Sequence, residues 1–158
     1  MSVSPDEFRS LLGRFPSGVT VVTTKAADGS DHGMTVSAFC SVSLEPPLVL
    51  ICIEKTASAY EALTTAPAFI VNILSAKQEQ LARRFAEVDI DRFEGVGFSR
   101  SGIGIAVLDD VLGIIECNRC AEHDAGDHTI IIGEVESGRS GDGKPLLYYR
   151  GGYAQLER

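Results

Sequence analysis

Residues 33–44 carry small hydroxyl side chains at alternate positions and no charged side chain. An exposed edge strand in an acidic protein is expected to carry Lys, Asp or Glu at such positions. Small side chains instead let a flat ligand lie against the backbone, with hydroxyl, N–H and C=O groups bonding its rim. The pattern leaves both interpretations open, an edge strand and the wall of a binding pocket. Because alternate residues of a strand share a face, the hydroxyl face comprises Thr35, Ser37, Phe39, Ser41 and Ser43. The face predicted to enter the core comprises Met34, Val36, Ala38, Cys40, Val42 and Leu44.

Ser58 lies where the sequence suits an anion. Ser58 and Glu61 have the spacing of a capping box, which predicts a short helix that begins near Ala59. The free N–H groups and the positive dipole end of a helix start favour a phosphate. Lys55 and Thr56 lie beside this start. The segment therefore predicts either a plain helix cap or a phosphate site, and the two are compatible.

Arg83 and Arg84 end a second predicted helix, which begins at Ser75 with Gln78 three residues later. Cations favour the negative end of a helix dipole, so a solvated helix end is one interpretation. An arginine brought near the start of the preceding helix would instead clamp a phosphate with two hydrogen bonds.

The spacing of the cysteines and histidines argues against a metal site, against thiol–disulfide redox chemistry and against a hydrolytic site. Cys117 and Cys120 form C-N-R-C without the second pair of a zinc ribbon. Their strand-like context places the two sulfur atoms on opposite faces. The four cysteines are therefore predicted to be reduced, mostly in the core. His32 is expected in a turn, and His123 and His128 flank a hairpin turn. No G-x-S-x-G motif marks a serine nucleophile.

Strands joined by turns dominate the elements that must hold these residues. A helix through Phe8, Leu11 and Leu12 follows a capping box at Ser4, and Asp28-Gly29 predicts a hairpin turn. Strands are predicted over residues 18–24, 33–44, 48–53, 68–74, 111–122, 129–136 and 146–149, and loops over 89–104 and 138–145. Helices do not alternate with the strands. The predicted fold is therefore mainly β, an antiparallel barrel with short peripheral helices.

Length and charge narrow the function classes. The chain has 158 residues, which predicts a single domain over residues 1–158. The formal net charge of −8 disfavours nucleic acid and anionic membranes as partners. No run of 18 apolar residues occurs, and the first residues lack the pattern of a secretory signal. A cytoplasmic location is expected.

Three segments read together resemble one known family. They are G-M-T-V-S-A-F-C-S-V-S-L-E-P-P-L-V, A-E-H-D-A-G-D-H-T-I-I-I-G-E-V and P-L-L-Y-Y-R-G-G-Y. Their order and spacing resemble the short-chain flavin reductases with an FMN-binding split barrel. These proteins are the reductase components of two-component flavin-dependent monooxygenases. The resemblance extends from about residue 8 to residue 153.

The resemblance implies a split-barrel homodimer that binds FMN or FAD. It also implies that NADH or NADPH reduces the flavin, which then leaves for a partner monooxygenase. The isoalloxazine ring would lie along Met34, Thr35, Val36, Ser37 and Ala38, and Ser41, Cys52, Ile53 and Glu54 would border the ring and ribityl chain. Ser58, Ala59, Arg84 and Phe85 would lie at the phosphate. His128, Arg150, Gly151, Gly152 and Tyr153 would contact the nicotinamide nucleotide.

Hydride transfer between stacked rings requires alignment rather than a general acid or base, so no catalytic residue and no metal is predicted. FMN and FAD stay open, as do NADH and NADPH. The alternatives are a flavin-binding module without activity, a split-barrel oxidoreductase with a deazaflavin or cobalamin, and a structural barrel.

Overall fold

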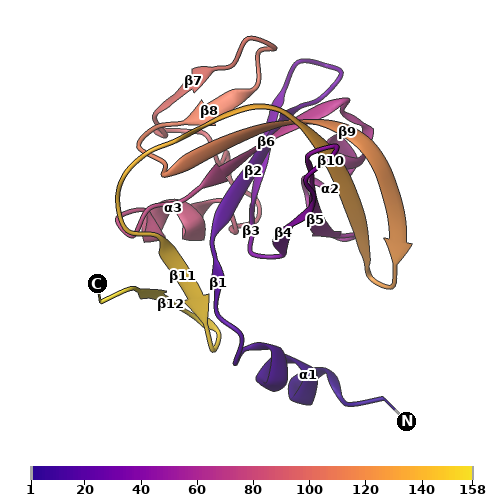
Figure 1. Cartoon of the computed structure of the whole chain (residues 1–158), viewed down its shortest axis with the longest axis vertical. Helices are drawn as coiled ribbons and strands as arrows, with labels where there is room; N and C mark the ends of the chain where they lie inside the picture. The colour runs from indigo at the N-terminus through magenta and orange to yellow at the C-terminus, as the bar shows by residue number, and fades with distance from the viewer. Residues whose placement is uncertain (1, 158) are drawn as a thin grey trace.

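A computed structural model of the chain describes residues 2–157, in which strands dominate and the helices are short. Seven antiparallel strands form the main sheet in the order β3-β2-β6-β9-β10-β5-β4 (Figure 1). These are β2 (Thr20–Lys25), β3 (Asp31–Val36), β4 (Phe39–Ser43), β5 (Leu48–Glu54), β6 (Ala68–Ile73), β9 (Gly113–Ala125) and β10 (His128–Ser140). The predicted mainly β fold is confirmed.

The two edges of this sheet are consecutive in the chain. Edge strand β3 pairs with β2, and edge strand β4 pairs with β5 at the other end of the sheet. Only Ser37 and Ala38 separate β3 from β4. The sheet must therefore curl until its edges meet, which makes a barrel with a split between β3 and β4.

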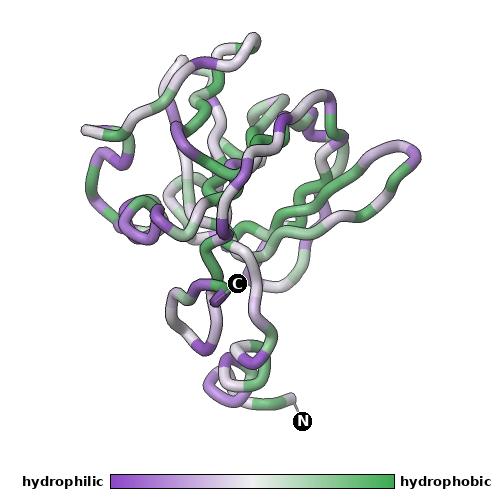
Figure 2. Tube along the Cα trace, turned by 60° about the vertical axis from the view of Figure 1, so that its left-hand side comes forward, coloured by the Kyte–Doolittle hydropathy of each residue, from purple (hydrophilic) through white to green (hydrophobic). Residues whose placement is uncertain are grey.

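Smaller elements surround the barrel (Figure 1). Strands β1 (Ser17–Gly18), β11 (Leu146–Tyr149) and β12 (Gly152–Gln155) form a three-stranded sheet, and β7 (Phe98–Arg100) pairs with β8 (Ala106–Leu108). The helices are α1 (Pro5–Leu12), α2 (Tyr60–Thr65) and α3 (Glu79–Arg84). Helix α1 projects from the barrel at the N-terminal end, and Figure 2 shows hydrophobic stretches on it as well as on the strands. Among residues 2–157, no helix is long and apolar enough to span a membrane.

The barrel encloses a packed core, in which Ile51, Phe69 and Ile131 are fully buried. One buried polar side chain is satisfied on all sides. The Asn72 amide donates to the Val21 carbonyl at 2.9 Å and to Thr23 Oγ1 at 3.1 Å, and it accepts the Leu108 N–H at 3.0 Å. Asn72 thus ties three segments together without an unpaired polar group.

Several local predictions are confirmed. The capping box of Ser4 and Glu7 opens α1. A turn at Gly29, with φ of +85°, joins β2 to β3. The predicted long hairpin is β9–β10, with its turn at Gly126 and Asp127 between the two flanking histidines.

Other expectations are wrong in identifiable ways. The predicted loop over residues 89–104 contains β7, the loop over 138–145 begins with the last residues of β10, and a strand, β12, follows Arg150. His32 lies in β3 rather than in a turn. The helix expected from Ser75 starts at Glu79, although the Ser75 N–H does bond Gln78 Oε1 at 2.9 Å.

The cysteines are free, as predicted, but only Cys117 is fully buried. Cys52 is half-buried, whereas Cys40 and Cys120 are exposed, so the expected core placement is wrong for these two. Burial raises the pKa of the Cys117 thiol to about 12. Cys117 therefore stays protonated at neutral pH and is a poor nucleophile.

Candidate functional site

The predicted site strand is broken at its centre. Val36 is buried and Phe39 packs against the barrel core, so the inward positions shift from even to odd numbers between them. The expectation of one continuous strand over residues 33–44 is therefore wrong, and so is the inward placement of Cys40, Val42 and Leu44. Val42 and Leu44 are 47% and 85% exposed. The reason is the split, because β3 and β4 belong to opposite edges of the sheet.

Ser37 and Ala38 lie at this break and are both exposed. The Ser37 carbonyl accepts the Phe39 N–H at 3.0 Å, and the Ala38 carbonyl accepts the Cys52 N–H at 3.0 Å. The break brings the end of β5 beside it, where Cys52, Ile53 and Glu54 lie. The predicted ring-binding residues of β3 and β5 are thus neighbours in space.

His128 extends this group by one strand. Glu54 of β5 pairs with His128 at the start of β10, Ile53 pairs with Thr129, and Cys52 pairs with Ile130. The side chains of Val36 and Ile53 are buried in the core, so any contact they make with a ligand is through the backbone.

The His128 ring is oriented by its neighbour in the chain. Nδ1 lies 2.7 Å from Asp127 Oδ1, and this hydrogen bond lowers the pKa of Asp127. Because a carboxylate only accepts, Nδ1 donates this hydrogen bond. Nε2 is the ring nitrogen that remains for a ligand.

A pocket of about 430 Å³ joins the break to the predicted nicotinamide segment. Ser37 and Ala38 form one wall, and Arg150 and Gly151 form another. Arg150 and Gly151 have φ of +52° and +77°, which makes the tight turn between β11 and β12. The remaining lining residues come mostly from α1 and the segment after it: Phe8, Arg9, Leu12, Gly13, Phe15, Ser17 and Tyr148.

Sequence reasoning missed this wall. The signal was present in the apolar spacing of α1, for which only a helix was predicted. Two arginines, Arg9 and Arg150, line a pocket that is otherwise rich in aromatic and aliphatic side chains. Such a lining suits a ligand with flat rings and phosphates.

Tyr153 does not line this pocket. The Tyr153 ring packs against the Tyr148 ring, with 5.5 Å between their centroids. The Arg83 guanidinium lies 5.0 Å from the centroid of the Tyr153 ring. Burial raises the pKa of Tyr153. Tyr153 therefore supports the hairpin from behind, and Arg83 is held by Tyr153 and by Glu79, 2.7 Å away.

A second pocket, of about 250 Å³, lies at the predicted phosphate end. It is lined by Asp31, His32, Gly33, Ser58, Ala59, Ile90, Asp91, Arg92 and Phe93. The predicted capping box of Ser58 and Glu61 does not form, because Ala59 is the residue before α2 and no side chain caps the helix. Helix α2 has six residues, so its start supplies no anion site of its own. The pocket itself does contain Ser58 and Ala59, as the prediction requires.

Arg84 and Arg92 have different roles at this pocket. Arg84 donates to the carbonyls of Arg92 at 2.9 Å and Asp91 at 2.7 Å, and so fixes the loop that lines the pocket. Arg92 lines the pocket directly and donates to the Gly33 carbonyl at 2.8 Å. Burial lowers the pKa of Arg92. Sequence reasoning chose Arg84 and missed Arg92, which lies in a loop without periodicity.

Thr35 and Phe85 join α3 to the edge of the barrel. Thr35 Oγ1 donates to the Ala82 carbonyl at 2.6 Å, and the Thr35 N–H donates to the Phe85 carbonyl at 3.1 Å. Phe85 is fully buried and meets Phe93 edge-to-face at 5.1 Å. The Phe85 side chain is therefore part of the core. The Thr35 hydroxyl already donates its proton to the Ala82 carbonyl, so toward a ligand it can only accept a hydrogen bond.

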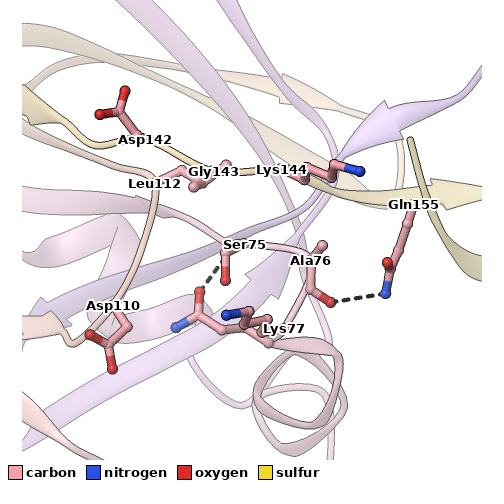
Figure 3. A pocket seen from close by; sticks show the side chains of 10 residues that line it. Ser75, Ala76, Lys77, Asp110, Leu112, Asp142, Gly143, Lys144 and Gln155 are labelled. Carbon is pink, nitrogen blue, oxygen red and sulfur yellow. Dashed lines mark hydrogen bonds between the residues drawn. The ribbon is translucent and has the colours of Figure 1, made fainter. Parts of the chain in front are cut away.

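Another pocket is lined by a different set of residues. Figure 3 shows this pocket of about 690 Å³, which contains none of the predicted site residues. Lys77 and Lys144 are offset by Asp110 and Asp142, and Gln155 donates to the Ala76 carbonyl at 3.2 Å. Its balanced charge gives no preference for an anion.

The residues at the split fit a flavin. Small side chains and exposed backbone at the break suit a flat ring, and the two adjoining pockets suit its substituents and a second nucleotide. Within residues 2–157, no cluster of three or more His, Cys, Asp or Glu side chains could hold a metal ion.

Several known proteins are similar to this chain in sequence and in structure. Residues 12–157 match the family described as flavin reductase like domain. The reductase subunit HsaB of a flavin-dependent monooxygenase from Mycobacterium tuberculosis is 37% identical over 158 residues, covering 98% of this chain and 84% of that protein. A flavin reductase (NADH) from Kitasatospora aureofaciens is 44% identical, covering 97% of this chain and 82% of that protein.

A solved structure agrees with this assignment. The NADH:FAD oxidoreductase of Streptomyces globisporus C-1027, in complex with NAD and FAD fragments, superposes with a TM-score of 0.91 at 36% identity. The match covers 99% of this chain and 96% of that one. The resemblance drawn from the three sequence segments is therefore confirmed, and the chain belongs to the flavin reductase-like domain family.

Proposed function

We propose that this protein is an NADH-dependent flavin reductase that reduces FMN or FAD and passes the reduced flavin to a separate monooxygenase. One observation carries the proposal. Ser37 and Ala38 leave the strand ladders and line the same pocket as Arg150 and Gly151. A flavin ring at the split and a nicotinamide ring in this pocket would then face each other. The names of the relatives support the same activity.

A bound flavin supplies the two-electron acceptor for the nicotinamide hydride. The chain supplies alignment. Small side chains at Ser37 and Ala38 let a ring approach the backbone, and Arg150 neutralises a phosphate of the dinucleotide. Phe8, Leu12 and Phe15 line the pocket and give it an apolar side. His128, held by Asp127, positions the nucleotide through Nε2.

No residue in this account exchanges a proton with the reacting atoms. Positioning of two reactants lowers an activation barrier by on the order of 7–11 kcal/mol in favourable cases. Alignment of the two rings can therefore account for catalysis without an acid or a base. The rate should accordingly lack a steep dependence on pH around neutrality.

The decisive experiment follows NADH oxidation through its absorbance with FMN, FAD and riboflavin in parallel, and with NADPH in place of NADH. Oxidation that requires both protein and flavin is the expected result. Flavin binding without oxidation would identify a binding module instead. Oxidation with a deazaflavin alone would identify another carrier, and neither binding nor oxidation would leave a structural barrel.

We further propose that the protein is a homodimer in the cytoplasm. Residues 48–53 of β5 and 130–133 of β10 are apolar on both faces, which is unusual for an antiparallel sheet with one face in water. Four free cysteines suit a reducing compartment. Sedimentation analysis and cell fractionation test these two statements separately.

A further inference from the structure

The pocket drawn in Figure 3 shares no lining residue with the two nucleotide pockets. Its volume of about 690 Å³ lies in the ordinary range for small-molecule sites. Three loops supply most of its wall: residues 75–78 between β6 and α3, residues 110–112 between β8 and β9, and residues 142–144 between β10 and β11. The proposed flavin reduction uses none of these residues, so the pocket is free for another ligand.

Hydrogen bonds between the loops give this pocket a fixed shape. The Ala76 N–H donates to the Lys144 carbonyl at 2.8 Å, and the Gly141 N–H donates to the Leu112 carbonyl at 2.6 Å. Gln155 of β12 donates from Nε2 to the Ala76 carbonyl at 3.2 Å. A site whose walls are already in place loses little free energy in ordering them when a ligand binds.

Four charged side chains line the pocket: Lys77, Lys144, Asp110 and Asp142. Among the residues that the structure describes, none of the four takes part in an ion pair. Figure 3 shows the reason for Lys144, because Asp110 and Asp142 lie on one side of Ser75 and Lys144 lies on the other. The pocket therefore has an acidic side formed by two carboxylates and a basic side at Lys144.

Apolar surface accompanies these charges. Leu112 and Ala76 are half-buried and line the pocket. Gly143, between Asp142 and Lys144, has a φ of +140°, and a Cβ there would lie 2.9 Å from Leu112 Cδ2. Only glycine tolerates both the backbone conformation and this close approach. The loop can thus lie against Leu112 while it carries one charge of each sign.

We infer that this pocket binds a small zwitterion whose ammonium and carboxylate groups are separated by a short apolar chain. The ammonium group would lie at Asp110 and Asp142, and the carboxylate at Lys144. A singly charged ligand is attracted by one side of the pocket and repelled by the other, whereas a zwitterion is attracted by both. The charges of the pocket lie on opposite sides, so an ω-amino acid suits it better than an α-amino acid. The inference is independent of the proposed function.

Three compounds with the same six-carbon chain test the inference on the full chain. At neutral pH, 6-aminohexanoate carries both charges, hexanoate only the negative charge and hexylamine only the positive charge. Isothermal titration calorimetry should show saturable binding of 6-aminohexanoate, with each of the other two bound at least ~10-fold more weakly. Addition of FMN and NAD⁺ should leave the dissociation constant of 6-aminohexanoate unchanged, because the nucleotide pockets are separate.

Charge-removing variants identify the two sides of the pocket. Lys144→Met keeps most of the apolar side chain, and Asp142→Asn keeps the shape of the carboxylate. Each should raise the dissociation constant of 6-aminohexanoate at least ~10-fold. The matched control is Lys25→Met, which removes a lysine that does not line this pocket and should change the constant less than ~2-fold. Circular dichroism verifies folding, which is expected because Asp142 and Lys144 are exposed; Asp110→Asn is a second acidic variant.

The results that would overturn the inference are specific. They are a lack of saturable binding, equal binding of the three compounds, and unchanged binding by the folded Lys144 and aspartate variants. Competition by FMN or NAD⁺ would overturn it as well, because 6-aminohexanoate would then occupy a nucleotide pocket. NADH oxidation by the natural protein is measured in parallel, so failure of the proposed flavin reduction is distinguishable from failure of this site.

Discussion

Replacing Ser37 with leucine should weaken flavin binding strongly while the barrel stays intact. Ser37 is exposed at the split, so a larger side chain there meets no core atom and costs the fold little. In the proposed complex, however, the ring lies directly on this position. The ring would then rest at about 3.5–4 Å from the leucine carbons, which keeps it from approaching the backbone to within the limit of about 3.2 Å for its hydrogen bonds.

The magnitude follows from the bonds that are lost. Two or three hydrogen bonds at about 1 kcal/mol each give a loss of about 2–3 kcal/mol, or roughly 30- to 150-fold in the flavin dissociation constant. Ser37→Ala keeps the space and removes only the hydroxyl, so its loss should stay below about 1 kcal/mol, roughly fivefold.

Flavin fluorescence quenching measures both constants, and a thermal unfolding scan shows that each variant is folded. A folded Ser37→Leu protein that binds flavin within about threefold of the natural affinity would remove the split from the site. It would leave the family assignment untouched, because that assignment rests on sequence and fold similarity.

Three further predictions concern the surroundings of the split. His128→Ala should raise the Michaelis constant for NADH and leave flavin affinity nearly unchanged, because His128 lies one strand away from the break; equal NADH kinetics would exclude a positioning role. Gly33→Ala should lower the melting temperature, because a Cβ there would lie 2.9 Å from the ring of Phe85; overpacking costs about 1–3 kcal/mol, and an unchanged melting curve would contradict the contact. The hydrogen bonds from Arg100 lower the pKa of Asp31, so this pair stabilises the fold above the ordinary carboxyl pKa and its contribution disappears as the pH falls through the lowered value. Asp31→Asn should reduce the pH dependence of the free energy of unfolding in that acid range. An unaltered pH dependence would show that other carboxylates determine it.

Local patterns predicted the elements whose cause is local. The capping box at Ser4 and Glu7 defines the start of α1, and the turn residues between the two long strands define the hairpin β9–β10. In both cases, neighbouring residues supply the hydrogen bonds or the backbone conformation that fixes the element. Sequence is sufficient there because the physics involves only a few adjacent residues.

Closure of the sheet and a run of local turns explain two of the predictions that were wrong. Alternation suggested one strand over residues 33–44, but closure of the sheet assigns β3 and β4 to opposite edges and breaks the strand between them. Ser58 and Glu61 have the spacing of a capping box, yet successive turns bond the Ala57 N–H to the Glu54 carbonyl and the Tyr60 N–H to the Ala57 carbonyl, so the helix begins later. A spacing rule cannot anticipate either event.

The same distinction applies to the site. Ser37, Ala38, Arg150 and Gly151 were named from motifs and do line one pocket. Arg92 and the apolar wall of α1 were missed, because their relevance depends on a fold that brings distant segments together. The motifs named residues that line one pocket, whereas residues that distant segments bring to the pockets carry no local pattern that names them.

The split itself links fold to function. An open edge strand exposes unpaired N–H and C=O groups, and natural sheets protect such edges from pairing with other chains. Here the two edges of one sheet lie next to each other across Ser37 and Ala38, and the residues around them are small and uncharged. Complete closure of the barrel would pair these groups and leave no room for a ring. The split leaves Ser37 and Ala38 exposed between the two edges, although their carbonyls already accept the Phe39 and Cys52 N–H groups, and on the β3 side the Thr35 N–H bonds the Phe85 carbonyl. The hydroxyl-rich segment is therefore explained by the position of the split, because small, uncharged and exposed residues lie there, where a flat ligand can approach them.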